Sequence, residues 1–368
     1  MPEELLQRIA LTMVPQIGDI VARALLQTFG SATEVFRTPY RKLEKIEGVG
    51  SIRANAIKKF KDFSHAEKEL EFINQSGIKA ISVLDKSYPE KLRFCADAPV
   101  LLYVKGNEEI LKHRSVAIIG TRNNSAYGRA WCTQFIEALK SHSINIVSGL
   151  AYGIDTIAHQ MSIEAGMPTT AVLAHGLDMI YPDENRGLAK KIVQNGLLVT
   201  EFRKGTQPDK QNFPRRNRIT AGLSDAVIVV ETGERGGSMI TADLAHQYNR
   251  DVFALPGRIT DVKSAGCHLL IKQQKAQIIT SAADLLENMG WNHAPQKKEI
   301  KQTILPLDLS DEQKIILTLI QEKKEIDIDL LQTMSQFSHG ALSSNLLQLE
   351  LMGLVQAMPG KKFRINFM

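Results

Sequence analysis

Apolar residues recur along the chain in two different rhythms, and the change between them divides the sequence. Between residues 5 and 62 they recur at helical spacing. The positions that set this spacing are Leu5, Leu6 and Ile9, then Ile20, Val21, Leu25 and Leu26. From Ser115 onward, short β-branched runs alternate with amphipathic segments. We therefore predict a small helical domain in residues 1–70 and an α/β domain in residues 71–290.

Six apolar runs in the second region predict β-strands. They are residues 116–119, 144–147, 170–173, 197–200, 226–230 and 252–255. Strands that are apolar at nearly every position are buried on both faces, which is typical of a parallel sheet covered by helices. The expected fold class is therefore α/β, with a Rossmann-like doubly wound parallel sheet.

The N-terminal region contains a sequence typical of a helix-hairpin-helix (SAM-like) turn. Gly48 and Gly50 flank the apolar Val49, and a helix is expected to begin at Ser51. Such a turn can point backbone N–H groups at a phosphate. A weaker copy surrounds Gly18. The same pattern fits a helical module that serves only for packing, and both interpretations stay open.

The C-terminal region predicts a polar linker and a winged-helix-like domain. Residues 291–308 are polar and contain two prolines, as linkers often do. Residues 309–368 predict three helices and a hairpin that turns at Pro359 and Gly360. The third helix, residues 341–352, contains no Lys or Arg, which does not favour reading of a duplex groove. A packing or interaction module is the alternative to DNA binding here.

Composition narrows the class of protein only slightly. The 368 residues include 45 Lys and Arg against 40 Asp and Glu, a net charge of +5 that many enzymes share. Cys95, Cys132 and Cys267 lie far apart and show no ligand spacing, which argues against a disulfide framework and structural zinc. The chain contains no run of about 18 apolar residues. We expect a cytoplasmic protein that needs neither a membrane nor a metal or other cofactor.

Glycine-rich turns follow three of the predicted strands. Ligands of open α/β sheets bind beyond the carboxyl ends of the strands, so these turns are candidate phosphate cradles. The candidate residues are Gly120, Thr121 and Arg122, then Ser148 and Gly149, then Gly237 and Ser238. The chain has no GxGxxG there, and no acid closes the second strand, which disfavours a dinucleotide site. Ordinary turn chemistry is the alternative for each turn.

A basic segment with one aromatic ring lies between the fourth and fifth predicted strands. Residues 203–218 hold six Lys or Arg against one Asp. The candidate contacts for single-stranded DNA are Lys210, Phe213, Arg215, Arg216, Asn217 and Arg218. A base can stack on Phe213 while neighbouring cations hold the phosphates. Alternatively, Phe213 fills a gap in the core, and Arg216 and Arg218 pair with acids.

A catalytic site has to be weighed against this binding surface. Asp155 and His159 lie one helical turn apart, and His175 and Asp178 follow the third strand. No serine or cysteine in an elbow motif accompanies them. Helix capping and buried hydrogen bonding are therefore the expected roles of these four residues.

Six ordered motifs together resemble the DNA-processing protein DprA (Smf) family. They are residues 118–122, residues 148–155, residues 175–178 with Tyr181 and Pro182, residues 213–219, residues 221–224, and residues 237–239 with Thr241 and Ala242. The helical N-terminal region and the winged-helix-like C-terminal region are similar to the usual architecture of that family.

The resemblance implies a homodimer that binds single-stranded DNA and helps load the RecA recombinase during natural transformation. It implies that Arg122 is the arginine of the DNA groove, and that Lys210, Phe213 and Arg216 lie in or beside the DNA-facing loop. No catalytic activity is expected. Related nucleotide-hydrolysing proteins place a catalytic Glu after a Gly-Gly turn, whereas the stretch from Gly236 to Asp243 has no Glu.

Overall fold

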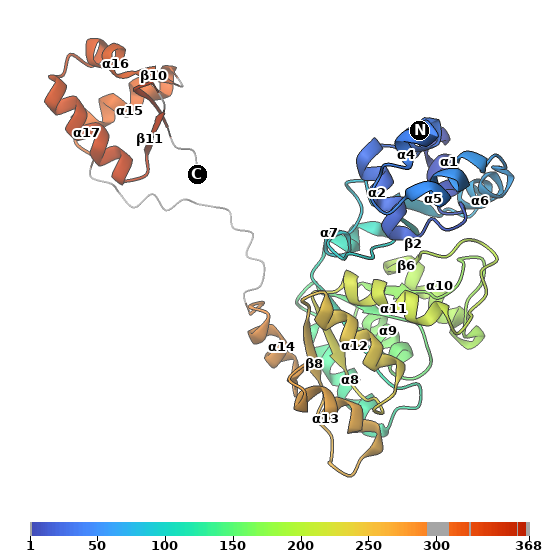
Figure 1. Ribbon diagram of the computed structural model, residues 1–368. Coiled ribbons are helices and arrows are strands. Elements are labelled where there is room, and N and C mark those ends of the chain that lie inside the picture. The colour runs from blue at the N-terminus through green and yellow to red at the C-terminus, as the bar shows by residue number, and fades with distance from the viewer. Residues whose placement is uncertain (1, 293–308, 324, 359, 366–368) are drawn as a thin grey trace. The chain divides into compact units, whose positions relative to one another are not determined.

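The protein folds as two compact units, residues 1–294 and residues 295–368 (Figure 1). The computed structural model describes residues 2–292, 309–323, 325–358 and 360–365. None of the helices in these ranges is long and apolar enough to cross a membrane. The predicted linker at residues 291–308 lies almost wholly outside the described residues.

A mixed sheet forms the centre of the first unit. Its strands run in the order β1-β2-β6-β5-β4-β3-β7-β8-β9. Their bounds are Lys79–Ser82 (β1), Leu101–Gly106 (β2), Ser115–Ile119 (β3), Asn145–Ser148 (β4), Thr169–Val172 (β5), Leu197–Thr200 (β6), Ala226–Val229 (β7), Asp251–Ala254 (β8) and Gln277–Ile278 (β9). The strands from β6 to β9 in this order are parallel, while β2 pairs antiparallel with both β1 and β6.

The order of the parallel strands confirms the predicted doubly wound topology. The chain moves outward from β3 through β4 and β5 to β6, and then returns to place β7 on the other side of β3. Val116 of β3 accordingly has Ile146 of β4 as its partner on one side and Ala226 of β7 on the other. The direction of winding therefore reverses between β3 and β7.

Helices cover both faces of this sheet. On one face lie α8 (Ala126–Leu139), α9 (Ile154–Glu164), α10 (Arg186–Asn195) and α14 (Ala282–Asn288). On the other lie α7 (Glu90–Arg93), α11 (Asn212–Leu223), α12 (Gly237–Gln247) and α13 (Ala265–Lys272). Short 3-10 helices span Glu108–Lys112, Asp183–Asn185 and Val262–Ser264.

The alternation of side chains along β3 explains why both faces need a cover. Val116 and Ile118 pack into the core under α8 and α9, whereas Ala117 and Ile119 pack into the core on the α11 and α12 side. Burying a side chain such as Ile118 contributes roughly 1.5–3 kcal/mol relative to leaving it exposed.

The N-terminal region is helical, as predicted. Its helices are α1 (Pro2–Leu11), α2 (Asp19–Phe29), α3 (Ala32–Arg37), α4 (Tyr40–Leu43), α5 (Gly50–Lys59) and α6 (Ser64–Gln75). At the start of α5, Gly48 and Gly50 have φ angles of 77° and 59°, which favour glycine, and Val49 is buried. Arg53 donates hydrogen bonds to the carbonyl oxygens of Gln16 and Gly48, and so joins the two predicted hairpin turns.

The second unit has the predicted winged-helix arrangement. Its helices are α15 (Asp311–Lys323), α16 (Ile328–Ser335) and α17 (His339–Leu351). A small sheet in the order β10-β12-β11 completes it, with the strands Ile326–Asp327 (β10), Val355–Met358 (β11) and Lys362–Ile365 (β12). Its own core contains Ile316, Leu331, Leu346 and Val355, so the described part of this unit packs around a core separate from the sheet of the first.

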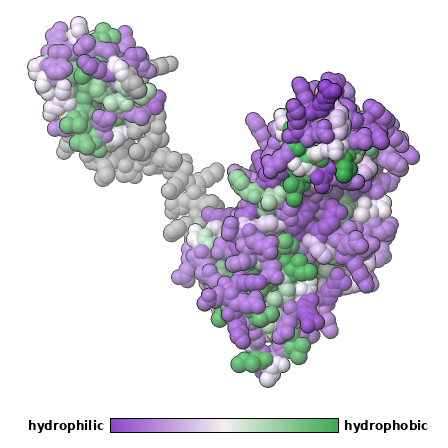
Figure 2. Space-filling model, viewed as in Figure 1, coloured by the Kyte–Doolittle hydropathy of each residue, from purple (hydrophilic) through white to green (hydrophobic). Residues whose placement is uncertain are grey.

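The surface of the first unit is mostly hydrophilic on the face shown in Figure 2. Hydrophobic atoms gather at its lower tip, where Figure 1 places the loop between β8 and α13. Ile259 and Val262 are the strongly exposed apolar residues of that loop, with 95% and 81% of their surface accessible.

Candidate nucleic-acid interface

A pocket of about 360 Å³ opens where the winding of the sheet reverses, at the carboxyl ends of β3 and β7. This is the position at which open α/β sheets bind their ligands. Of the residues predicted from sequence, those that line the pocket are Gly120, Thr121, Arg122, Phe213, Arg216, Asn217, Gly237 and Ser238. Ser148, Gly149, Lys210, Arg215 and Arg218 do not line it.

The turn after β3 is not an open anion cradle, because the chain's own Glu231 occupies it. The backbone N–H of Ser125 donates to Glu231 Oε2 at 2.8 Å, and the Ser125 hydroxyl donates to the other carboxylate oxygen. Gly128 leaves the space for this carboxylate, since a Cβ there would lie 2.6 Å from the Glu231 carboxyl carbon. The expectation of a free phosphate site at the start of α8 is therefore corrected.

The turn after β4 is also filled from within. Asp155, in the first turn of α9, accepts hydrogen bonds from the backbone N–H groups of Gly149 at 3.1 Å and Ala151 at 3.4 Å. Ser148 is fully buried, and its hydroxyl donates to the carbonyl oxygen of Ile118 at 2.7 Å. The second expected cradle thus holds a carboxylate of the protein.

The turn after β7 stays open toward the pocket. Gly236 is the N-cap residue of α12, and no side chain caps this helix N-terminus. Gly236, Gly237 and Ser238 line the pocket, and Asn217 Nδ2 donates to the carbonyl oxygen of Gly237 at 3.4 Å. Uncapped N–H groups and the helix dipole favour an anion at such a position.

Arg216 brings a buried positive charge to the same pocket. The side chain is 7% exposed, and its Nη1 atom lies 4.0 Å from Asp155 Oδ2. Its Nε atom has no hydrogen-bond partner among the described residues. Burial lowers the pKa of Arg216 and raises the pKa of Asp155, and the attraction between the two opposes both shifts. A buried guanidinium that is incompletely hydrogen-bonded is stabilised by an anionic ligand.

Gly149 makes the position of Arg216 possible. A Cβ at residue 149 would lie 1.4 Å from Arg216 Nη1, so any larger residue collides with the guanidinium. Gly149 therefore serves the pocket by leaving space, and not by offering a free N–H group.

Aromatic rings lie beside the cations of the pocket. The exposed Arg122 guanidinium lies 5.3 Å from the ring centroid of Phe213, and the ring of Tyr181 lies 6.2 Å from that of Phe213 at an angle of 61°. Phe213 is only partly buried, so it does not fill a gap in the core. Phe213, Tyr181 and Tyr152 all line a small hollow next to the pocket.

Tyr152 and Tyr181 were not among the candidate residues chosen from sequence. They are 40% and 41% exposed, and the Tyr152 hydroxyl donates to Glu184 Oε2 at 2.6 Å. The sequence could have indicated them, because both lie in turns that follow the predicted strands β4 and β5. An aromatic ring in such a turn is seldom buried in the core.

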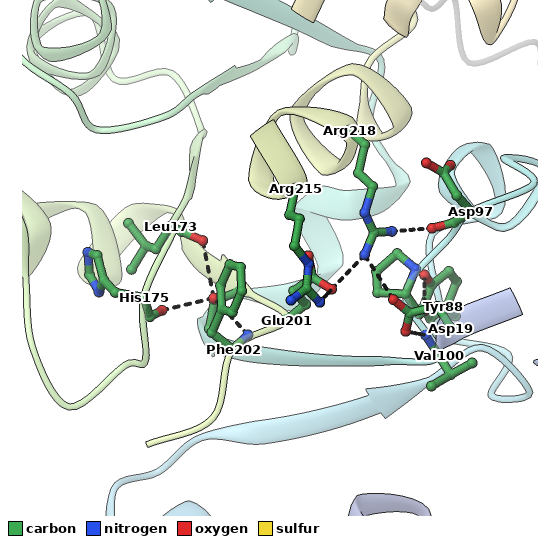
Figure 3. A network of polar contacts seen from close by, with 12 residues as sticks. Asp19, Tyr88, Asp97, Val100, Leu173, His175, Glu201, Phe202, Arg215 and Arg218 are labelled. Carbon is green, nitrogen blue, oxygen red and sulfur yellow. Dashed lines mark hydrogen bonds and ion pairs between the residues drawn. The ribbon is translucent and has the colours of Figure 1, made fainter. Parts of the chain in front are cut away.

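The remaining basic candidates lie away from the pocket. Lys210 is exposed in the loop before α11. Arg215 Nη2 donates to Glu201 Oε2 at 3.0 Å. Arg218 is buried and donates to Glu201 Oε2 at 2.5 Å, to Asp19 Oδ2 at 3.0 Å and to the carbonyl oxygen of Asp97 (Figure 3). Arg218 therefore has the structural role that the sequence left as an alternative, since it ties α11 to α2 and β6.

The residues of the catalytic alternative are engaged within the fold. His159 is fully buried with Nδ1 2.7 Å from Thr169 Oγ1, and burial lowers its pKa to about 3. His175 is buried and accepts the backbone N–H of Tyr181 at Nε2. Asp178 accepts the backbone N–H of Gly205. Within the described ranges, no group of three or more His, Cys, Asp or Glu residues could hold a metal ion.

Comparison with known proteins identifies relatives along nearly the whole chain. The family model "DNA recombination-mediator protein A" matches residues 79–290, and the model "DprA winged helix domain" matches residues 302–361. Protein Smf of Synechocystis is 32% identical, with 97% of each chain covered. Protein Smf of Escherichia coli K12 is 35% identical, with 82% of this chain and 81% of that one covered.

Two solved structures resemble this one. The crystal structure of DNA processing protein A from Streptococcus pneumoniae superposes with a TM-score of 0.66 at 36% identity, over 76% of this chain and 95% of that one. A structure of DNA processing protein A from Helicobacter pylori, described for its single-stranded DNA binding mode, gives a TM-score of 0.54 at 30% identity. It covers 59% of this chain and 97% of that one.

Proposed function

Since the chain belongs to the DNA recombination-mediator protein A (DprA/Smf) family, we propose that the pocket between β3 and β7 binds the backbone and bases of single-stranded DNA. The observation that carries the proposal is the meeting of Arg216, Arg122 and the open N-terminus of α12 in one pocket. Together they form a site for one phosphate.

The aromatic rings extend the proposal from phosphate to base. Phe213, Tyr181 and Tyr152 lie next to the phosphate site and offer faces on which unpaired bases stack. Bases in a duplex do not expose those faces. Among the residues chosen from sequence, we propose Gly120, Thr121, Arg122, Phe213, Arg216, Asn217, Gly237 and Ser238 as contacts. Lys210 and Arg215 contribute positive charge near α11, while Ser148, Gly149 and Arg218 shape the site.

The test compares one strand with its duplex. Fluorescence anisotropy with a labelled 12-nucleotide strand and the blunt duplex of the same sequence, at several salt concentrations, measures both affinities. We expect tighter binding of the strand, and a fall in log affinity with log salt because phosphate contacts release counterions. Equal affinities for strand and duplex would contradict the proposal.

We further propose, from family membership, that the protein is a cytoplasmic homodimer that helps load RecA onto incoming single strands during natural transformation. Light scattering tests the dimer, which should show twice the chain mass of 40.9 kDa. RecA filament formation on strands coated with single-strand-binding protein tests the loading, and the protein should accelerate it. A rate unchanged by the protein argues against loading.

We propose that binding, and not catalysis, is the activity of this pocket. Asp155, which lines the pocket, and Glu231, in a neighbouring turn, are held by backbone N–H groups. Incubation with nucleoside monophosphates should release no base above the buffer background. Steady release of base would overturn this part of the proposal.

A further inference from the structure

A groove of about 410 Å³ lies between α10 and the loop that follows β5. Its lining residues are Lys105 of β2, residues 177–180 of the loop, Arg186, Ala189, Lys190 and Val193 of α10, and Leu198 of β6. The groove shares no lining residue with the pocket between β3 and β7, or with the small hollow next to that pocket. It is therefore a separate feature of the first unit.

Most of the lining of this groove is apolar and open to solvent. Six of its ten residues are apolar, namely Leu177, Met179, Ile180, Ala189, Val193 and Leu198. The three loop residues and Val193 are only partly buried, so an occupant of the groove can touch them. Ala189 and Leu198 belong to the core under α10. Because apolar surface that faces water is stabilised by a cover, the groove favours an occupant with apolar side chains.

The charged groups of the lining are mostly positive. Lys105, Arg186 and Lys190 are cations, and Asp178 is the carboxylate among them. Asp178 Oδ1 already accepts the backbone N–H of Gly205 at 3.1 Å, and Arg186 pairs with Asp183. Within the residues that the structure describes, neither lysine forms an ion pair. The groove thus has positive charge to offer to an anion.

Lys105 is the most informative of these cations, because it is half-buried in the groove. It is paired with Leu198 in the register of β2 and β6, so the two side chains lie on the same face of the sheet. An ammonium group that is partly removed from water and has no described carboxylate partner favours a nearby anion. The groove therefore suits an occupant that is both apolar and negatively charged.

The dimensions of the groove limit the occupant to a short segment of chain. Arg186 and Val193 are seven residues apart in α10, which corresponds to about 10 Å along the helix axis. An extended chain advances about 3.3 Å per residue, so about three residues span the groove. Side chains alternate between the two faces of such a chain, so the first and third of these residues point into the groove together.

We propose that this groove binds a short acidic segment of a partner protein in extended conformation. Two apolar side chains, two residues apart, pack on Leu177, Ile180 and Val193, and the acidic residues around them meet Lys105 and Lys190. This proposal goes beyond DNA binding and does not depend on it, since the two sites share no residue. Ile180 lines the groove and its neighbour Tyr181 lines the hollow near Phe213, so the partner is held next to the proposed DNA site.

Fluorescence anisotropy with labelled synthetic peptides tests the proposal on the full chain. The probe has the sequence Asp-Asp-Leu-Asp-Leu-Asp-Asp. One control peptide has Ser in place of both Leu, and the other has Lys in place of every Asp. We expect the probe to bind with a Kd below about 100 µM and about tenfold more tightly than either control. The first control lacks the apolar side chains, and the second is repelled by the cations of the groove.

Lys190→Glu tests the location of the bound peptide, and Lys191→Glu is its matched control. Both residues are exposed on α10 and both changes alter the net charge equally, but Lys191 does not line the groove. Lys190→Glu should weaken binding of the probe about fivefold, because an attraction becomes a repulsion. Lys191→Glu should bind the probe within about twofold of the wild type. The thermal midpoint should be the same in all three proteins.

Four outcomes would overturn the proposal. The first is no binding of the probe up to about 1 mM. The second is equal affinity for the probe and the Ser control, which would show attraction to charge alone. The third is equal weakening in Lys190→Glu and Lys191→Glu, which would place the peptide elsewhere. The fourth comes from light scattering: if Lys190→Glu alone converts a dimer into a monomer, a second copy of this chain covers the groove.

Discussion

Arg122 differs from the other arginines near the site because its guanidinium is exposed and its described contact is with the ring of Phe213. Arg122→Ala should weaken binding of every single strand alike. The slope of log affinity against log salt should become shallower by about 0.7, the value for one phosphate contact on a single strand. Anisotropy titrations at four salt concentrations measure both effects.

Arg258→Ala is the control for this prediction, because it removes an exposed cation that does not line the pocket between β3 and β7. Its salt slope should equal that of the wild type. The thermal midpoint of Arg122→Ala should stay unchanged as well. A lower midpoint with an unchanged slope would assign Arg122 a structural role.

His159 should make the protein less stable as the pH falls. Burial lowers its pKa to about 3 in the folded state from an ordinary value of 6.5, so the unfolded chain binds the proton first. The contribution of His159 to the free energy of unfolding is therefore complete above pH 6.5 and decreases as the pH falls below that value. Between about pH 7.5 and about pH 5, the wild type should lose about 2 kcal/mol more than His159→Gln.

Urea unfolding of the wild type and of His159→Gln at several pH values measures how the free energy of unfolding of each changes with pH. The exposed His65 provides the control, and His65→Gln should follow the wild type. If His159→Gln shows the same pH dependence as the wild type, the buried imidazole is not the group that titrates on unfolding.

At the scale of elements, α11 carries one buried arginine and one exposed arginine that donate to the same carboxylate oxygen. Arg218 and Arg215 both donate to Glu201 Oε2, with 9% and 55% of their side chains exposed. Arg218→Met should cost about 3–5 kcal/mol, since it leaves a buried carboxylate without its main partner. Arg215→Met should cost at most about 1 kcal/mol, as exposed pairs do.

Urea unfolding of the two variants at neutral pH tests the comparison. The difference follows from burial, because the chemistry of the lost contact is the same in both. Equal losses of stability in the two variants would show that Arg218 does not stabilise the buried Glu201 carboxylate more than Arg215 does. This result would contradict the anchoring role of Arg218.

The elements that the sequence predicted well are those with a strong local pattern. The apolar runs at 116–119 and 226–230 became β3 and β7 because both faces of a central strand are buried. The antiparallel strands β1 and β2 were missed, and the edge strand β9 is only two exposed residues long, too short for any pattern.

The candidate site was predicted in part, and the errors concern the turns that were expected to be vacant. Arg122, Phe213 and Arg216 were chosen from local sequence and line one pocket. The filling of two turns by Glu231 and Asp155 was missed. Glu231 lies 106 residues from Ser125, and the sequence around Ser125 does not predict that contact. The β3 turn is therefore filled by a distant side chain that no local pattern reveals, whereas Asp155 lies only six residues from Gly149, within the same motif.

At the scale of the whole molecule, the two units have separate cores. We propose that the first unit binds DNA by itself, because the pocket between β3 and β7 lies wholly within it. A chain that ends at Asn292 should unfold cooperatively and bind the 12-nucleotide strand within about twofold of the full chain. Loss of most binding in a chain that still unfolds cooperatively would make the second unit part of the site.

The two carboxylates at the sheet edge also bear on competition between free nucleotides and longer strands. An open α/β sheet with three vacant helix turns would bind free nucleotides. With Glu231 and Asp155 in place, a mononucleotide meets negative charge at two of the three turns and finds a single phosphate position. A polymer overcomes that weakness by making several contacts at once, since each further contact forms at a high effective concentration. If the pocket between β3 and β7 binds a phosphate as proposed, the filled turns favour long strands over mononucleotides.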